Sequence, residues 1–488
     1  MPPEPALSRR GFLASAGALL GGSLFAPVAA RAARLAPAAP HRFVSRPDLR
    51  PPVVSVTTAG TDAADGLVFI APFQITGRAD PKYGALIVDE RGEPIWFRPE
   101  ATKTAMNLRV QKYRGKPVLT WYEGIVLGGG YGGEYVIADQ RYREVARVRA
   151  GHGEHGDLHE FLLTSRGTAL ITIYSDIPAD LTSVGGPVNG QLTEGVIQEI
   201  DVATGKVLAE WRSSSHVGLD ESVLPTVKGS VADYFHLNSI AVDTDGHLLV
   251  SARNTSAVYK VHRQTGKIMW RLGGKQSDFT IVPGAEFSFQ HDVRRHADGT
   301  LTIFDNDATD PKSTLPARPI RLALDMGAMT AKLVREYRTA DTRVAWAMGN
   351  VEQLPDGGVF VGWGTAGSFT EFAPDGTVRL DASFADGSSS YRAFRAPWVG
   401  RPAELPRVAV TRDAHGVVVY VSWNGATEVA NWRAELGSVG KTFKPVATAR
   451  RQSFETALRL GNRKGLLRMT ALDAAGKPLG RSAVHWLV

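Results

Sequence analysis

Residues 233–274 carry the pattern of two consecutive β-hairpins. Alternating apolar residues flank a turn at Asp245-Gly246, and a second alternating set flanks a turn at Thr265-Gly266. Glycine supplies the positive φ that a tight hairpin turn requires, so both dipeptides are strong turn signals. Four short strands in about forty residues match one unit of a β-propeller, in which four-stranded sheets repeat around an axis.

The same unit recurs along residues 67–399, and we count six copies. The repeat length is about fifty residues, as in the longer propeller repeats. Helical periodicity is nearly absent from this region. The sequence therefore predicts an all-β protein whose residues 67–399 form a six-bladed β-propeller, with the candidate chemistry where the first strands of the blades converge.

The texture changes after residue 400. Residues 400–488 contain about seven short strands separated by turn residues, a pattern typical of an immunoglobulin-like or fibronectin type III-like β-sandwich. Trp423 and Trp432 are expected in its core. We expect this module to brace the propeller or to bind a partner, not to catalyse.

The N-terminus resembles an export signal. Ser8–Leu13 has the twin-arginine pattern, and a mildly apolar run leads to small residues around Arg31. We predict that residues 1–32 are a signal peptide read by the twin-arginine export machinery, and that residues 33–66 are an extended lead-in. The run is Gly-rich and weakly apolar, which argues against a stable membrane anchor. The mature protein is expected in the periplasm or outside the cell.

Composition removes several classes of function. The chain has no cysteine, which excludes disulfides, thiolate metal ligands and cysteine nucleophiles. The formal net charge of +7 is small for 488 residues, and Lys and Arg are scattered along the chain. Nucleic acid is therefore not an expected partner.

The repeats place polar residues in register. Counting back eight residues from the turn glycine of each inner hairpin leads to an amide or an imidazole: Asn107, His159, Asn238 and His291. The sixth unit has Gly349 at this position with Asn350 beside it, and His236 lies two residues before Asn238. If the units superpose, these side chains converge on one mouth of a central channel. The alternative is that they bond backbone groups between blades.

Other polar residues leave two interpretations open. Arg253 and Asn254 end one inner strand, and Asn306 follows another; each could meet an anion or link blades. His152 and His155 lie in a Gly-rich loop before His159, a spacing that could bind a metal, although a solvated loop is the favoured reading. We expect no metal site and no cofactor.

Five short segments carry a family resemblance. They are 236–239 (HLNS), 251–256 (SARNTS), 270–274 (WRLGG), 289–292 (FQHD) and 304–306 (FDN). Together with a similar sequence pattern from residue 45 to 427, these segments resemble the arylsulfotransferase (arylsulfate sulfotransferase) family, and in particular its actinobacterial and fungal branch.

The resemblance implies an exported enzyme that moves a sulfuryl group from an aryl sulfate ester to a phenol, without the nucleotide sulfate donor. Members of the family use channel histidines and an arginine, with one histidine carrying the group in passing. Carried over by motif and position, the catalytic candidates are His236, His291, Arg253 and Arg318. The substrate-binding candidates are His159, Asn238, Asn254, Asn306 and Asn350.

The sequence departs from the bacterial pattern in two places. The arginine expected just beyond Asp305-Asn306 is missing, and Arg318 is the nearest substitute. The later histidine that accepts the sulfuryl group has no clear counterpart, because the sixth unit offers Gly349-Asn350 there. If the chain transfers sulfate, then His236 or His291 is the nucleophile, or transfer is direct.

Two other functions stay open from the sequence. A secreted propeller without chemistry would bind an aromatic or anionic ligand in the same channel. A quinone-cofactor dehydrogenase on a propeller is the second, but the tryptophan-rich repeats and calcium-ligating carboxylates typical of that class are not evident.

Overall fold

The structure is a computed structural model that describes residues 39–60, 64–75, 80–125, 132–224, 229–307 and 313–487. The predicted signal peptide, residues 1–32, lies outside the described residues. Nearly all of the regular secondary structure of the described chain is β-strand, which confirms the all-β prediction. Its short 3-10 helices are η1 (Thr182–Val184), η2 (Ser213–Ser215), η3 (Leu219–Glu221) and η4 (Gly364–Ala366). No helix among the described residues is long and apolar enough to span a membrane.

The predicted double hairpin forms one four-stranded antiparallel sheet. Its strands are β14 (Leu237–Val242), β15 (Leu248–Ala252), β16 (Ala257–Val261) and β17 (Ile268–Gly273), paired in that order. The turn glycines Gly246 and Gly266 have φ of 82° and 71°, which is the left-handed conformation that the turns need. The hairpin prediction is confirmed.

Two further sheets follow the same plan. One has the order β18-β22-β21-β20-β19, with β18 (Thr280–Ile281), β19 (His291–Arg295), β20 (Leu301–Asp305), β21 (Arg318–Asp325) and β22 (Thr330–Glu336). The other has the order β1-β26-β25-β24-β23, with β1 (Val54–Ala59), β23 (Asn350–Gln353), β24 (Val359–Gly362), β25 (Ser368–Phe372) and β26 (Val378–Phe384). Part of the predicted extended lead-in is thus the edge strand β1.

Two consecutive four-strand meanders are joined into a nine-stranded sheet. The first contains β5 (Thr104–Tyr113), β6 (Lys116–Gly124), β7 (Gly133–Ala138) and β8 (Glu144–Val148). The second contains β9 (Gly156–Leu163), β10 (Thr168–Ala179), β11 (Gly190–Asp201) and β12 (Val207–Arg212), with β13 (Val231–Asp233) alongside β11. A single pairing, Gly133 with Gly156, connects the two meanders.

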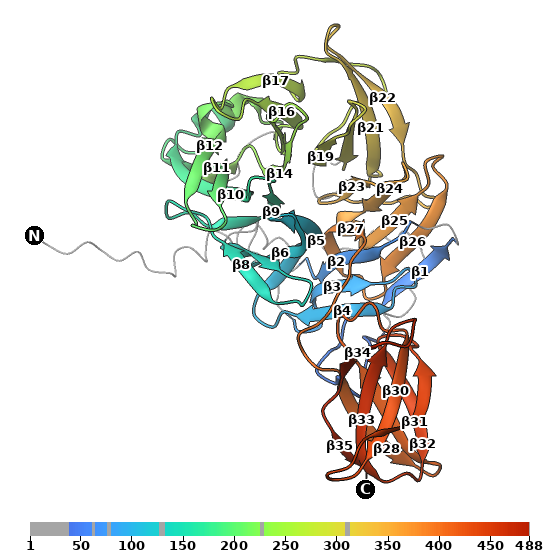
Figure 1. The fold of residues 1–488 in the computed structure, drawn as a ribbon. Coiled ribbons are helices and arrows are strands. Elements are labelled where there is room, and N and C mark those ends of the chain that lie inside the picture. Colours follow the sequence, from blue (N-terminus) through green and yellow to red (C-terminus); the bar gives the residue numbers. More distant parts are fainter. Residues whose placement is uncertain are drawn as a thin grey trace, which may run out of the picture.

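The chain closes on itself through a sheet made from distant segments. Its order is β27-β2-β3-β4, with β2 (Leu67–Phe73), β3 (Gly84–Val88), β4 (Pro94–Pro99) and β27 (Ser389–Ala396). The edge strands β27, β5, β9, β14, β19 and β23 contact one another in this sequence, and β23 contacts β27 in turn. They form a closed ring, around which the sheets are arranged in Figure 1.

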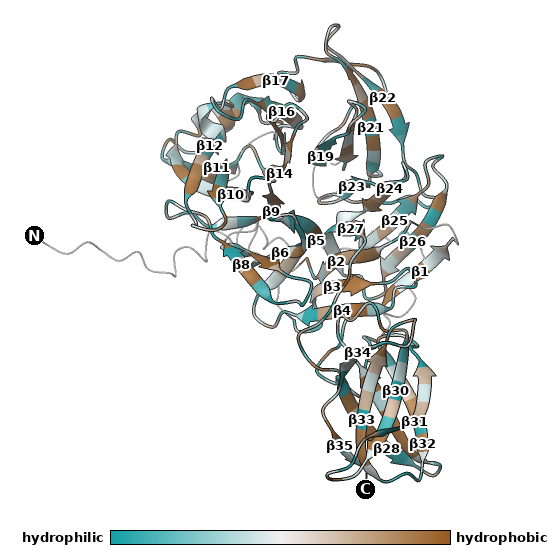
Figure 2. Ribbon diagram, viewed as in Figure 1, coloured by the Kyte–Doolittle hydropathy of each residue, from teal (hydrophilic) through white to brown (hydrophobic). Residues whose placement is uncertain are grey.

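Each sheet of the ring is buried on both faces, because it is packed between two neighbours. In β15 every residue is buried. Leu248 and Val250 pack towards the preceding sheet, whereas Leu249 packs towards the following one. This alternation explains the apolar run of β15, and Figure 2 shows the apolar residues of the strands in brown. Burial of apolar area at about 25 cal/mol per Å² makes these seams the main stabilising contacts.

The last two sheets lie below the ring in Figure 1. One contains β28 (Arg407–Asp413), β29 (Gly416–Ser422) and β32 (Glu455–Gly461). The other contains β30 (Asn431–Gly437), β31 (Lys444–Arg450), β33 (Gly465–Leu472), β34 (Pro478–Arg481) and β35 (His485–Leu487). They share one apolar core in which Trp432 is buried, as predicted. Trp423 only borders this core, and its Nε1 donates to the carbonyl of Glu404.

The segment that joins the ring to the C-terminal sheets, near residue 400, is hydrogen bonded on both sides. The Gly400 amide donates to Oγ1 of Thr427 at 3.0 Å, and the Arg401 amide donates to the Gln140 carbonyl at 2.8 Å. Asn424 pairs with both backbone groups of Phe97 on β4, each at 2.9 Å. The C-terminal sheets are therefore fastened to the edge of the ring.

Candidate active site

The amides predicted in register link neighbouring inner strands. Nδ2 of Asn107 donates to the Leu158 carbonyl at 2.7 Å. Nδ2 of Asn238 donates to the Gln290 carbonyl at 2.7 Å, and Nδ2 of Asn350 donates to the Ala393 carbonyl at 2.8 Å. The repeat register predicted from the sequence is thus present in the structure. In these three strands the amides bond backbone groups of the neighbouring strand, which was the alternative to a role in the channel.

His159 lies in the first half of β9, where the fully buried carboxylate of Asp157 holds its ring. Its Nδ1 is 2.6 Å from Oδ1 of Asp157, and the His159 backbone amide donates to the same oxygen at 2.9 Å. The carboxylate holds the ring through Nδ1, which leaves Nε2 as the nitrogen that a substrate could meet. No described residue bonds to this Nε2.

His236 has the same arrangement one strand further. Its Nδ1 lies 2.5 Å from Oδ2 of Asp233, and no described residue bonds to its Nε2. It precedes β14 with φ of 55°. Phe289, two residues before His291, and Met348, two residues before Asn350, share this left-handed conformation. Burial lowers the pKa of His236 below the ordinary 6.5, although Asp233 opposes the shift. The imidazole is therefore neutral at neutral pH.

The two free nitrogens belong to neighbouring rings. The ring centroids of His159 and His236 are 5.1 Å apart, and the rings meet at 80°. Aromatic walls enclose them: Tyr174 is 5.2 Å from the His159 ring and 5.4 Å from the His236 ring, and Tyr391 is 5.3 Å from that of His159. The pair forms a small imidazole cluster between aromatic rings.

His291 differs, because both of its nitrogens are bonded. Nδ1 donates to Oδ1 of Asn306 at 2.7 Å, and Nε2 accepts the Met348 amide at 3.2 Å. Burial, reinforced by the charge of Arg253, lowers the pKa of His291 well below its ordinary value. The lone pair needed for attack is engaged, and the ring holds β19 to the segment before β23.

Arg253 brings a positive charge to the cluster. It follows β15, and its backbone amide donates to the His236 carbonyl at 2.9 Å. The guanidinium lies over the Phe289 ring at 4.6 Å, and Nη1 donates to Oδ1 of Asn254 at 2.9 Å. Its Nε is buried without a partner, and no described carboxylate forms an ion pair with Arg253. Such a group is suited to bind an anion.

The side chains of Arg318 and Asn306, two other candidates, form hydrogen bonds with groups outside the imidazole cluster. Arg318 donates from Nε and Nη2 to Oδ2 of the buried Asp305, at 3.0 and 2.7 Å. Nδ2 of Asn306 donates to the carbonyls of Ala345 and Met348. Likewise, Nδ2 of Asn254 donates to the Asp233 carbonyl at 2.6 Å. These hydrogen bonds stabilise the segments that surround the imidazole cluster.

A charged cluster that sequence reasoning missed fills the ring beside the histidines. Glu160, fully buried, contacts the guanidiniums of Arg294, Arg109 and Arg392 at 2.6, 2.8 and 3.2 Å. Asp292 contacts Arg294 at 2.6 Å and Arg392 at 3.3 Å. Burial alone would raise the pKa of Glu160, but the three guanidiniums outweigh it and hold that pKa well below its ordinary value. Three guanidiniums thus contact two buried carboxylates in this cluster.

Comparisons with known proteins identify the family. The profile of the family described as arylsulfotransferase (ASST) matches residues 109–385, which is more than half of the chain. The protein belongs to the arylsulfotransferase family. No curated protein matches the chain.

Solved structures give more distant similarities. A Bacteroides caccae protein of unknown function shares 13% identity, covering 68% of this chain and 100% of its own, with a TM-score of 0.41. An inactive virginiamycin B lyase from Staphylococcus aureus shares 9% identity, covering 76% of this chain and 97% of its own, with a TM-score of 0.34.

The family match includes all three histidines and Arg253, but not Tyr391. It also includes the loop considered for a metal. His152 contacts Oε2 of Glu210 at 2.8 Å, and His155 is exposed. Among the described residues, no three side chains of metal-ligating type come together. We therefore build no function on a metal in this arylsulfotransferase-family chain.

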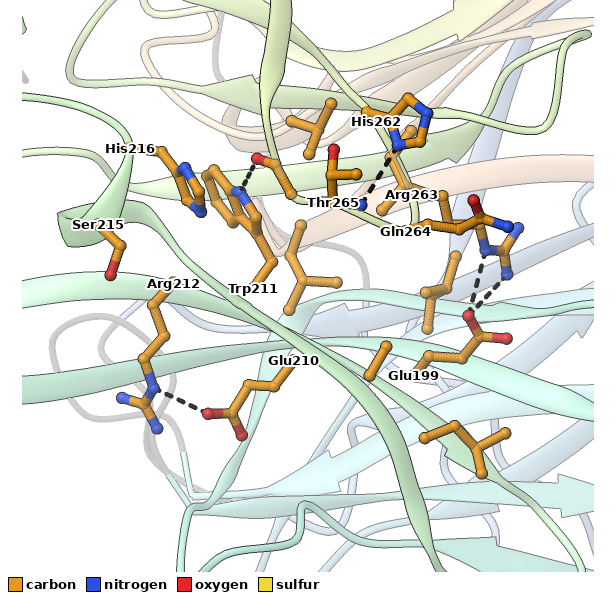
Figure 3. Close-up of a pocket in the computed structure, with 17 residues that line it drawn as sticks. Glu199, Glu210, Trp211, Arg212, Ser215, His216, His262, Arg263, Gln264 and Thr265 are labelled. Atoms are coloured by element: carbon orange, nitrogen blue, oxygen red, sulfur yellow. Dashed lines mark hydrogen bonds and ion pairs between the residues drawn. The ribbon is translucent and has the colours of Figure 1, made fainter.

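A cavity of about 460 Å³ lies away from the histidines, between β12 and the β16–β17 turn. Figure 3 shows that its polar side chains bond each other: Arg212 with Glu210, and Arg263 with Glu199. Trp211 is covered by the stacked ring of His216, 5.4 Å away, and donates to the Gly266 carbonyl. The imidazoles of His216 and His262 also line the cavity, but no described carboxylate holds either ring as Asp157 and Asp233 hold those of the imidazole cluster.

Proposed function

We propose that this family member transfers a sulfuryl group from an aryl sulfate to a phenol, with His236 as the nucleophile. The observation that carries the proposal is the pair of imidazoles at 5.1 Å whose Nε2 atoms no described residue bonds, beside the unpaired Arg253. A neutral imidazole is a competent nucleophile, and a sulfate ester is the anion that Arg253 would bind.

The transfer would take two displacements. First, the Nε2 lone pair of His236 attacks sulfur, the N–S bond forms, and the bond from sulfur to the aryl oxygen breaks. Asp233 on Nδ1 stabilises the positive charge that the ring then carries. Second, the acceptor phenol oxygen attacks sulfur, and the N–S bond breaks. In each displacement one bond to sulfur forms and one breaks, and the three sulfuryl oxygens stay bonded to sulfur. The reaction therefore needs no cofactor.

Arg253 would hold the sulfuryl oxygens during both displacements. A donor aimed at charge that spreads in the transition state is worth on the order of 10²–10³-fold in rate. His291 and Arg318, also predicted to be catalytic, would act as supports, because their polar atoms are engaged by Asn306, Met348 and Asp305.

The proposal includes the finer architecture. The six inner strands that contact in a closed ring support a six-bladed propeller over residues 67–399. The two sheets around Trp432 support a β-sandwich of immunoglobulin or fibronectin III type over residues 400–488. The twin arginines Arg9 and Arg10 support export by the twin-arginine machinery. Replacing both by Lys should keep the precursor in the cytoplasm, whereas unchanged secretion would contradict export.

The experiment is an assay with 4-nitrophenyl sulfate, with and without added phenol. The proposal predicts release of 4-nitrophenol that depends on the acceptor, together with formation of phenyl sulfate. Release at the same rate without acceptor would indicate hydrolysis. Binding of the ester without any release would favour a non-catalytic propeller that holds an aromatic anion.

A further inference from the structure

The carboxylates behind the two reactive histidines differ in their surroundings. Asp157 is fully buried, and its Oδ1 accepts three donors: Nδ1 of His159 at 2.6 Å, the His159 amide at 2.9 Å and Oγ1 of Thr172 at 2.9 Å. Its Oδ2 is buried without a partner in the described residues. The Asp157 carboxylate is thus rigid and shielded from water.

Asp233 is the more solvated partner. Its side chain is 36% exposed and ends strand β13, although its Oδ1 is buried without a partner in the described residues. An ionic interaction weakens as the local dielectric rises, so an exposed carboxylate stabilises a charged ring less than a buried one at similar distance. The His159–Asp157 pair, with three hydrogen bonds to one carboxylate oxygen, is also the more firmly positioned of the two.

We infer that His159 and Asp157 form the proton-transfer pair of this site, with His159 as general acid and base and Asp157 as its positioning residue. The inference rests on the proposed sulfuryl transfer and adds to it. It assigns different roles to the two histidines, which the sequence alone does not distinguish. His236 carries the sulfuryl group, and His159 carries the proton.

The protons balance over one cycle. In the first displacement, Nε2 of the protonated His159 gives its proton to the aryl oxygen as that oxygen leaves sulfur. In the second, the acceptor phenol gives its proton to Nε2 of the neutral His159 as its oxygen attacks sulfur. The proton lost by the acceptor is thus the proton that the next leaving phenol receives, and Asp157 stabilises the charged ring between the two steps.

This arrangement specifies a class of donor. A leaving group such as 4-nitrophenolate departs without protonation, whereas an unactivated phenolate needs a proton as the bond breaks. A site with a buried proton carrier is therefore built for sulfate esters of unactivated phenols. We expect the parent protein to use phenyl sulfate as well as nitrophenyl sulfate.

The test compares the two donors in an Asp157→Asn variant with a constant acceptor. Asparagine keeps the shape and an acceptor oxygen for Thr172, but it lacks the charge that holds the proton on His159. General acid catalysis is worth on the order of 10²–10⁴-fold, and kcat/KM for phenyl sulfate should fall by that factor. For 4-nitrophenyl sulfate, the loss should stay below about 10-fold, since leaving-group protonation contributes little there.

Asp233→Asn is the matched control, because the same change behind His236 should lower kcat/KM for both donors by a similar factor. Equal losses for both donors in Asp157→Asn, or a donor-dependent loss in Asp233→Asn instead, would overturn the assignment. If Asp157→Asn does not fold, His159→Gln is measured against the same criterion. A parent protein that transfers nothing contradicts the proposed function, whereas an active parent with equal losses contradicts only this inference.

Discussion

The imidazole rings of His159 and His236 meet at 80° with their centroids 5.1 Å apart. Each ring is held through Nδ1 by an aspartate, and no described residue bonds either Nε2. The pairing joins the starts of β9 and β14, two inner strands that are neighbours in the ring. It explains how a chain without cysteine, and without the later histidine of the bacterial pattern, can present two imidazoles to one substrate.

His236→Asn should abolish transfer while leaving the fold intact. Asparagine tolerates the φ of 55° at this position better than alanine does, so a loss of activity reports the lost imidazole. We expect kcat to fall by at least about 10³-fold, as for loss of a nucleophile. Circular dichroism melting checks the fold, and the exposed His155→Asn serves as the control. Full activity in His236→Asn would exclude this residue as the nucleophile.

His291→Ala should lower stability more than it lowers activity. It leaves Oδ1 of Asn306 and the Met348 amide without partners, each at a cost of about 1–3 kcal/mol for a buried group. Denaturant unfolding should therefore show a loss of several kcal/mol, with transfer per folded molecule within about 10-fold of the parent. A stable variant with no transfer would instead return His291 to the catalytic set.

Arg253→Gln and Arg318→Gln should fail in different ways. Arg253→Gln removes a cation without an ion-pair partner in the described chain, and kcat/KM should fall by on the order of 10²–10³-fold with little change in melting temperature. Arg318→Gln leaves the buried Asp305 unpaired, which costs about 3–5 kcal/mol of stability. Kinetics and melting of both variants separate the roles. The opposite outcome would make Arg318 the anion-binding residue.

Activity should fall in acid, with its midpoint below pH 6.5. His236 attacks only when neutral, and burial lowers its pKa below 6.5 against the opposing effect of Asp233, with His159 and Arg253 also acting to lower it. Turnover is therefore retained as the pH falls to about 6.5 and is lost as the pH passes through the lowered pKa. The measurement is a pH profile of kcat/KM with 4-nitrophenyl sulfate, whose leaving group needs no proton. A midpoint above 6.5 would show that another group controls the reaction.

Asn424→Ala should loosen the C-terminal sheets from the ring. It removes both hydrogen bonds to Phe97 on β4, and we expect a loss of about 1–3 kcal/mol in the free energy of unfolding. Limited proteolysis near residues 400–404 should be slow in the parent, because Gly400 and Arg401 are bonded there, and faster in the variant. Transfer should be unaffected. Rapid cleavage of the parent would show that the linker is open.

The local parts of the fold were predictable and the distant pairings were not. Turn glycines such as Gly246 fix hairpins within a few residues, so the strands of 233–274 were correctly predicted. The pairing of β2 with β27 joins Phe73 to Ser389, and nothing near either residue signals it. The innermost strand of the first sheet is therefore β27, which comes from the far end of the repeat region.

The candidate site shows the same limit. Asp157 and His159 are two residues apart and follow the His152–His155 loop, for which a metal was considered from the sequence. Spacing alone did not show that Asp157 holds the His159 ring. Both ring nitrogens of His291 are engaged by hydrogen bonds with Asn306 and Met348. Because these partners come from other segments of the chain, the motif around His291 does not predict the bonds. The positive φ of His236 likewise breaks the strand alternation from which its direction was inferred.

The most direct test of the account is to trap the sulfuryl group on the protein. The parent is mixed with 4-nitrophenyl sulfate in the absence of acceptor, quenched under alkaline conditions that preserve an N–S bond, digested and analysed by mass spectrometry. The account predicts one added sulfuryl group on the peptide that contains His236, lost on addition of phenol and absent from His236→Asn. A sulfuryl group on another residue, or acceptor-dependent turnover with no labelled peptide under any quench, would contradict it.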